Sequence, residues 1–268
     1  MIYPTFEQLK CIAPQGDEAI LQAVASKLPE LGPRYGLDTM RQVIHFIAQA
    51  AHETDGFRVT REYASGEAYE RRGDLGNTES GDGVRFKGRG IFMLTGRDNY
   101  GKMGEMIGRD LVSDPDQAAD PAISVEIALC YWRSRSLNLL AEANDFIGVT
   151  RRINGGVNGF ADRKLYFGRA CEALGETDSL MPQIAGLLGP GDRGQAVMEL
   201  QHLLNEKRGA GLDADGRYGP ATVAAVKALE KELGLTIDGI GHPAVCEALA
   251  GLPEPAGPAD PAEAYFLV

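Results

Sequence analysis

A glycine-rich stretch between helical regions is the feature that most limits the fold. Residues 73–90 combine frequent glycine with Asn77, Ser80 and Asp82, which disfavours a regular helix and predicts loops with short strands. On both sides, apolar residues recur at helical spacing. These helical patterns cover residues 21–31, 39–53, 124–132 and 162–174. We expect Asp38 to cap the second helix and Gly56 to end it. Residues 1–178 are therefore predicted to form a mainly α domain of the α+β type.

A second domain is predicted after a segment with the composition of a linker. Residues 179–190 are rich in glycine and small residues, and residues 191–252 hold three short helical patterns. Two Asp-Gly turns, at 213–219 and 236–241, join these helices and indicate a weak internal duplication. We expect a small three-helix bundle, followed at 253–268 by a loose tail rich in proline, alanine and acid.

Charge and composition exclude several classes of function. The net charge of -11 argues against general affinity for nucleic acid or anionic membranes. No apolar run is long enough to span a bilayer, and the N-terminus lacks a signal-peptide pattern, so we expect a soluble protein made in a cytoplasm. The cysteines are Cys11, Cys130, Cys171 and Cys246. Their wide spacing fits neither a zinc site nor a disulfide framework and predicts buried thiols. No metal or organic cofactor is expected.

Two carboxylates are candidates for glycosidic chemistry, which needs one carboxyl to protonate the leaving oxygen and another to activate water or attack the sugar. Glu53 ends an apolar helix, where partial burial would favour its protonated form. A continuous helix would put Glu62 on the opposite face, so both can face one cleft only if the chain turns near Asp55-Gly56. Because the chain has 38 acidic residues, solvated surface is the alternative interpretation of this pair.

Three separated motifs give the pair a context. The segments AHETDGF (51–57), 61–101 and INGG (153–156) resemble glycoside hydrolase family 19, which holds plant-type chitinases and many bacteriophage endolysins. The resemblance implies a lysozyme-like catalytic domain with Glu53 as acid and Glu62 as base. It also implies that the Thr95 hydroxyl helps to hold the hydrolytic water. An inverting single displacement follows, with the carboxyls roughly 6.5–9.5 Å apart, or more in an open cleft.

The same resemblance identifies substrate-binding candidates. Asn99 and Asn154 match asparagines that bind sugar, since an amide can bond hydroxyl and N-acetyl groups together. Arg163 matches an arginine that supports the acid. Each has an alternative: Thr95 as an ordinary strand residue, Asn154 as a turn cap, and Arg163 as a surface charge.

Other nearby side chains bear on the mechanism and the substrate. His52 is expected to pack or to support the site, and Glu67 and Glu70 to lie on a solvated cleft wall. Two positions depart from the plant-type pattern, because Met93 replaces a glutamine and Asn158 replaces a glutamate. The insertions that lengthen the plant cleft are also absent, and together these differences favour peptidoglycan over chitin.

The second domain has a resemblance of its own. The segments GDRGQAVMELQHLLN (191–205) and 213–235 resemble the peptidoglycan-binding domain type 1. Arg217 and Tyr218, on the first Asp-Gly turn, are the expected ligand contacts. The usual aromatic-glutamine pair is Leu229-Glu230 here, so a helical appendage that has lost binding is the alternative.

Together the two resemblances imply an endolysin. We expect a monomeric muramidase that cleaves the β-1,4 bond between N-acetylmuramic acid and N-acetylglucosamine. Bacterial peptidoglycan would be its partner, and it would depend on a holin for export from the host cytoplasm to the periplasm and cell wall. The alternatives are a chitinase and a non-catalytic wall-binding protein. An amidase or peptidase would need zinc ligands or a Cys/His arrangement that the sequence lacks.

Overall fold

The computed structural model describes residues 2–253, so nearly all of the predicted tail at 253–268 lies outside the described residues. The chain separates into two compact units. Unit 1 comprises Met1–Gly156 and Asp162–Pro182, and unit 2 comprises Val157–Ala161 and Gln183–Val268.

Unit 1 is built from helices, as predicted. They are α1 (Phe6–Ile12), α2 (Glu18–Leu31), α3 (Met40–Glu53), α4 (Asp82–Arg85), α5 (Arg97–Ile107), α6 (Pro121–Ser134), α7 (Leu137–Glu142), α8 (Phe146–Asn154), most of α9 (Phe160–Leu174) and the start of α10 (Thr177–Ala185). No helix within residues 2–253 has the length and apolar character needed to cross a membrane.

Helix α3 forms the centre of unit 1. All ten residues from Gln42 to Ala51 are buried. Seven are apolar, and the polar ones, Gln42, His45 and Gln49, form internal hydrogen bonds. Thr39, rather than the expected Asp38, caps it: the Thr39 side chain accepts from the Gln42 N–H in a capping box. The helix ends at Glu53, as predicted, so this carboxyl projects from the end of a rigid buried element.

The glycine-rich segment forms loops and short helical turns, but the expected short strands are absent from the described residues. Pairing is limited to isolated antiparallel bridges, from Arg61 to Arg89 and from Arg89 to Leu94. Side chains replace the missing strand ladder. Asp82, almost fully buried, binds Arg97 at 2.5 Å, and a charge-assisted contact of this kind can fix an irregular backbone.

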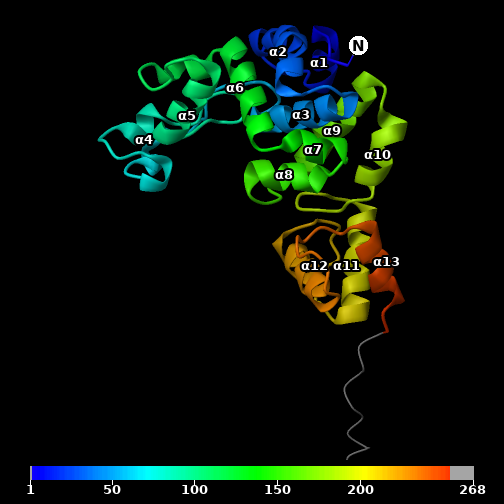
Figure 1. The fold of residues 1–268 in the computed structure, drawn as a ribbon. Helices are drawn as coiled ribbons and strands as arrows, with labels where there is room; N and C mark the ends of the chain where they lie inside the picture. The colour runs from blue at the N-terminus through cyan, green and yellow to red at the C-terminus, as the bar shows by residue number, and fades with distance from the viewer. Residues whose placement is uncertain (1, 254–268) are drawn as a thin grey trace, which may run out of the picture. The chain divides into compact units, whose positions relative to one another are not determined.

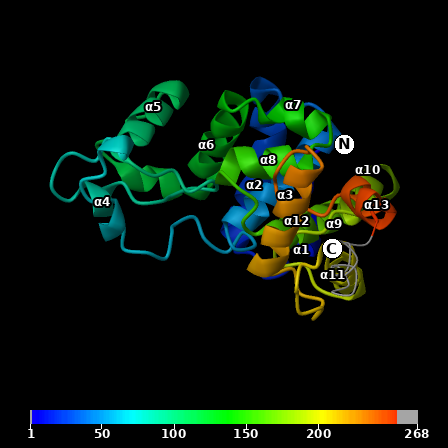
Figure 2. The ribbon, with the colours of Figure 1, turned by 90° about the horizontal axis from the view of Figure 1, so that it is seen from below.

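Helix α5 was not anticipated from the sequence because it contains two glycines, which weaken helical propensity. Gly104 is required by packing, since a Cβ there would lie 2.4 Å from the Arg109 carbonyl oxygen. In both ribbon views, α4 and α5 lie across α6 from α3 (Figures 1 and 2). The glycine-rich segment and α5 thus form one side of unit 1, and α3 lies on the other.

Unit 2 is a small three-helix bundle, as predicted, of α11 (Gln195–Arg208), α12 (Pro220–Glu232) and α13 (Pro243–Gly251) (Figure 1). Its buried core consists of Val197, Leu200, Leu204, Tyr218, Val226, Leu229, Val245 and Leu249. The expected linker is partly helical, because α10 continues to Ala185 with Pro182 inside it. The apolar positions of that segment outweighed its glycine and proline content.

The two Asp-Gly turns of unit 2 are built alike, which supports an internal duplication. Gly216 and Gly239 both adopt left-handed backbone angles, with φ of 70° and 76°. A buried side chain from the preceding helix accepts each glycine N–H at 2.9 Å. That acceptor is Gln201 in the first turn and Glu230 in the second.

The cysteines are unpaired. Cys130 and Cys171 are buried as expected, but Cys11 is exposed and Cys246 only partly buried. The prediction of four buried thiols was therefore wrong for Cys11, which lies on the outer face of the short helix α1.

Candidate active site

The predicted acid is held by a buried network. The Arg163 guanidinium is fully buried and its Nη2 donates to Oε1 of Glu53 at 2.6 Å. Its Nη1 donates to Gln49, one turn earlier on α3, and Gln49 in turn donates to the Thr150 hydroxyl at 3.1 Å. The alternative that Arg163 is a surface charge is wrong. Arg163 holds the Glu53 carboxyl in place from a fully buried position.

This contact leaves one oxygen of Glu53 for chemistry. The Glu53 side chain is 19% exposed, so it reaches solvent from a partly buried position. Partial burial, which the sequence predicted for Glu53, is therefore accompanied by a direct contact from the Arg163 guanidinium. Because Arg163 binds Oε1, Oε2 is the oxygen that can carry and deliver a proton.

The predicted base lies in a loop, held by two donors. Glu62 Oε1 accepts from the Gly88 N–H at 2.6 Å, and Oε2 accepts from the Tyr69 hydroxyl at 2.9 Å. Burial, together with this hydrogen bond, raises the pKa of Tyr69, so its hydroxyl remains a donor. The result is an oriented carboxylate, the form that a general base needs.

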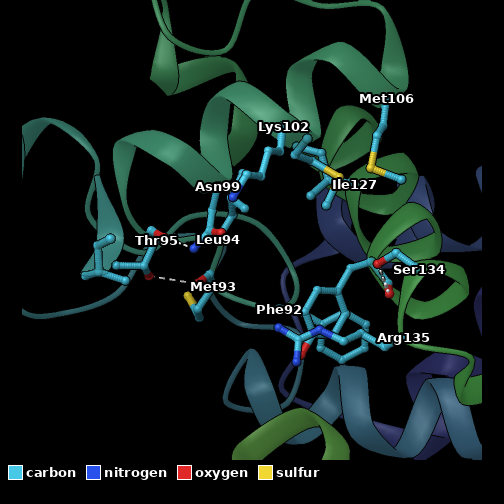
Figure 3. A pocket seen from close by; sticks show the side chains of 13 residues that line it. Phe92, Met93, Leu94, Thr95, Asn99, Lys102, Met106, Ile127, Ser134 and Arg135 are labelled. Carbon is cyan, nitrogen blue, oxygen red and sulfur yellow. Dashed lines mark hydrogen bonds between the residues drawn. The ribbon is translucent and has the colours of Figure 1, made fainter. Parts of the chain in front are cut away.

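Thr95 and Asn99 come together in a hollow of about 370 Å³ between α5, α6 and the loop before α5 (Figure 3). The Thr95 hydroxyl donates to the Met93 carbonyl at 2.8 Å, and the Asn99 amide donates to the Thr95 carbonyl at 2.7 Å. Thr95 belongs to a loop and not to a strand. Its hydroxyl can still accept a hydrogen bond from a water molecule.

Tyr131 links this hollow to Glu53. It lines the hollow, and its pKa is raised by burial and, to a lesser degree, by the charge of Glu53. Glu53 and Glu62 do not themselves line the hollow. The predicted acid and base therefore lie outside the lining of the hollow, and Tyr131 is the lining residue on which the charge of Glu53 acts.

Asn154 lies in a neighbouring hollow. Arg135 lines both this hollow and the one that contains Thr95. Asn154 is the last residue of α8, and Gly155, with φ of 78°, ends the helix. Asn154 is exposed, so its amide is available to a ligand.

The nearby titratable groups have structural partners. His52 binds Asp162 at 2.6 Å, consistent with a supporting role. Glu70 accepts the N–H groups of Gly81 and Gly83 at 2.9 Å, and these bonds lower its pKa. Glu70 therefore holds the glycine-rich loop, whereas Glu67 is exposed.

One of the two expected contacts in unit 2 is unsuitable. Tyr218 is only 2% exposed and belongs to the core, and its hydroxyl donates to the Gly239 carbonyl at 2.9 Å. Its apolar ring and its internal bond explain why it faces inward. Arg217 is exposed and stays a candidate contact.

Three side chains with metal-ligating chemistry also meet in unit 2. One ligand atom from each of Glu230, Asp238 and His242 lies within 4.8 Å of the others. Burial raises the pKa of Glu230, and the neighbouring Asp238 raises it further. Burial alone would raise the pKa of Asp238, but hydrogen bonds from His242 and the Ile240 N–H hold this pKa below its usual range. The pKa values of the two carboxyls are therefore shifted in opposite directions, which favours the negative charge on Asp238.

Sequence reasoning missed several residues that shape the site. Gln49 precedes Glu53 by one helical turn, a spacing that could have revealed it. Thr150, Tyr69 and Tyr131 carry no local signal, because their roles depend on contacts between distant segments.

Comparisons with known proteins identify the families of the two parts of the chain. Residues 16–158 match the family model for chitinase class I, which covers more than half of the chain. The chain belongs to glycoside hydrolase family 19. Unit 1 is thus the hydrolase part of a glycoside hydrolase. Residues 193–249 match the model of a peptidoglycan binding domain.

Relatives and solved structures are similar to the family 19 part. A glycosyl hydrolase family 19 domain-containing protein of Haemophilus influenzae is 33% identical over 187 residues, covering 58% of this chain and 90% of the relative. Acidic endochitinase Q of Nicotiana tabacum is 30% identical over 182 residues, covering 57% of this chain and 69% of the relative. Chitinase C from Streptomyces griseus shares the fold, with a TM-score of 0.54 and 22% identity over 64% of this chain and 76% of that one.

Proposed function

We propose that this chain is a muramidase that hydrolyses the β-1,4 bond between N-acetylmuramic acid and N-acetylglucosamine in peptidoglycan. The observation that carries the proposal is the presence of two units in one chain. One is a family 19 hydrolase with a buried Arg163–Glu53 pair, and the other matches a peptidoglycan binding domain. In this role, unit 2 holds the hydrolase on its polymer and raises the local concentration of cleavable bonds.

The mechanism is a single displacement. Glu53 protonates the glycosidic oxygen through Oε2, while Arg163 keeps Oε1 in place. Glu62 removes a proton from a water molecule on the opposite face of the sugar, and the Thr95 hydroxyl orients that water. Inversion at the anomeric carbon follows from one displacement.

The biological setting is part of the same proposal. A muramidase of this kind acts as a bacteriophage endolysin, a monomer that waits in the host cytoplasm and reaches the wall when a holin opens the inner membrane. Arg217 on the exposed first turn of unit 2 is the proposed contact to peptidoglycan.

A chitinase is the second candidate. It is favoured by the similarity of unit 1 to plant endochitinases and to bacterial chitinase folds. Chitin oligosaccharides share the β-1,4 linkage and the N-acetyl group but lack the lactyl ether and the stem peptide. Efficient turnover of soluble chitohexaose with no release of muropeptides would identify this alternative.

The test is digestion of purified peptidoglycan by the wild type and by Glu53→Gln, with mass spectrometry of the fragments. We expect muropeptides with new reducing N-acetylmuramic acid ends from the wild type only. Glu30→Gln, an exposed carboxylate on α2, is the matched control and should digest like the wild type. Product formation that persists in Glu53→Gln, or cleaved peptide bonds with intact glycan, would overturn the proposal.

A further inference from the structure

We propose that the hollow of unit 1 selects carboxylate-bearing aminosugar polymers over neutral ones through Lys102 and Arg135. This inference rests on the proposed function, because it assigns a charge to the substrate of that site. Two cationic side chains line the hollow. Lys102 belongs to α5, and Arg135 immediately follows α6 (Figure 3). Both side chains are exposed and therefore available to a ligand.

The lining of the hollow has an unusual charge balance for this chain. The protein carries 38 acidic and 27 basic residues, yet the lining contains two cations and no carboxylate. Because no carboxylate lines the hollow, the charges of Lys102 and Arg135 give it a local positive potential. Such a recess attracts anionic groups and repels none.

The neighbouring hollow continues the same pattern. Its lining adds Arg151 and Arg152 to the shared Arg135. One acidic residue, Asp145, also lines it. Its carboxylate accepts the Gly148 N–H at 2.8 Å at the start of α8, so it is engaged with the helix terminus.

These cations form no ion pair within the described residues, although Arg152 donates to the Arg135 carbonyl at 3.1 Å. Within residues 2–253, no carboxylate forms an ion pair with Lys102, Arg135, Arg151 or Arg152. By contrast, Arg89 of the glycine-rich segment binds Asp116, and Arg97 of α5 binds Asp82. The cations of the two hollows are thus free to meet charge on a ligand.

The position of Arg135 connects this charge with the reaction. Its guanidinium lies over the Tyr131 ring, 5.1 Å from the centroid, a contact that restricts its orientation. Tyr131 lines the same hollow as Thr95 and Asn99. A substrate carboxylate bound by Arg135 would therefore lie in the hollow where these residues are predicted to contact the sugar and the water.

The chemistry of the polymers decides which one fits. Peptidoglycan carries a lactyl ether on every second sugar, extended by a peptide with free carboxylates. Chitin repeats N-acetylglucosamine and carries no charge. Cations beside the cleft should strengthen the binding of peptidoglycan and leave the binding of chitin unchanged.

The experiment compares two forms of one glycan. Solubilised peptidoglycan with intact stem peptides is split, and one half has its carboxylates converted to neutral amides. The wild type, Lys102→Gln/Arg135→Gln and the control Lys27→Gln/Arg34→Gln are assayed on both forms at low and high salt. The control removes the same charge from exposed or partly exposed positions on α2 and the turn after it, which line neither hollow.

We expect the wild type to prefer the anionic form, and the double variant to lose roughly 3- to 10-fold of that preference, as two exposed ion pairs would give. High salt should reduce the preference in the wild type, and the control should keep it. Equal kcat/KM of the wild type on both forms, or an unchanged preference in the double variant, would overturn the inference while leaving the muramidase proposal intact. Failure of the wild type to cleave either form would instead overturn the proposed function.

Discussion

Replacing Glu230 with glutamine should stabilise unit 2 and remove a dependence on pH. Glu230 is fully buried. Its Oε2 accepts the Asp238 and Gly239 N–H groups at 2.9 Å, while its Oε1 has no hydrogen-bond partner. In the equivalent turn, the Gln201 amide donates to Asp215 at 3.2 Å. Glu230→Gln would place the same kind of donor beside Asp238.

The sign and the size follow from proton linkage. Burial and the neighbouring Asp238 raise the pKa of Glu230 above its ordinary value of 4.5, so the native state keeps a proton that the unfolded chain releases. The stability that this proton adds to unit 2 is fully present below the ordinary pKa of 4.5. It is lost as the pH rises above that value, by about 1.4 kcal/mol per pH unit. The loss ends at the native pKa. Glu230→Gln has no proton to release, so its stability should stay level.

The assay is scanning calorimetry of the full chain at pH 5, 6 and 7, with fluorescence of the single tryptophan, Trp132, reporting on unit 1. We expect the unit 2 transition of the wild type to fall with pH and that of Glu230→Gln to remain constant. Glu247→Gln, an exposed carboxyl of α13, is the matched control. The reciprocal Gln201→Glu should create a similar dependence in the first turn.

Two results would refute this reasoning. Equal pH dependence in the wild type and Glu230→Gln would mean that Glu230 is not the titrating group. A rise in the wild-type transition with added Zn²⁺, absent in Glu230→Gln, would mean that a cation joins Glu230, Asp238 and His242 in place of a proton.

Two further predictions concern unit 1. Gly88→Ala should lower kcat on the order of 10- to 100-fold, because the new Cβ would lie 3.2 Å from the Glu62 carboxyl carbon. The control Gly73→Ala, where nothing lies within 4 Å of the new Cβ, should match the wild type. Equal kcat for both variants would contradict a role for Glu62. Burial lowers the pKa of His45 to about 4 from 6.5, so the unfolded state binds more protons between these values and acidification through this window should cost unit 1 about 3 kcal/mol. Urea titrations followed by tryptophan fluorescence should show this loss in the wild type and a flatter profile in His45→Phe, whereas parallel profiles would assign the acid sensitivity to other groups.

The sequence by itself determined the helices with strong periodicity and the positions of the chemical candidates. The apolar repeat of α3 placed Glu53 at its end, because helical periodicity depends only on neighbours a few residues away. Order and spacing of several motifs identified family 19 and the second, helical domain. The same local reasoning expected short strands in the glycine-rich segment and missed α5, where packing around Gly104 outweighs propensity.

Only the tertiary structure decided what surrounds those candidates. Glu53 and Arg163 are 110 residues apart in the chain, and no local pattern predicts that the arginine is buried behind the acid. The same holds for the inward-facing Tyr218 and for Lys102 and Arg135, which line one hollow together with Tyr131. Which side chains meet depends on how helices pack, and packing is fixed by the shape and burial of the whole unit rather than by neighbours in sequence.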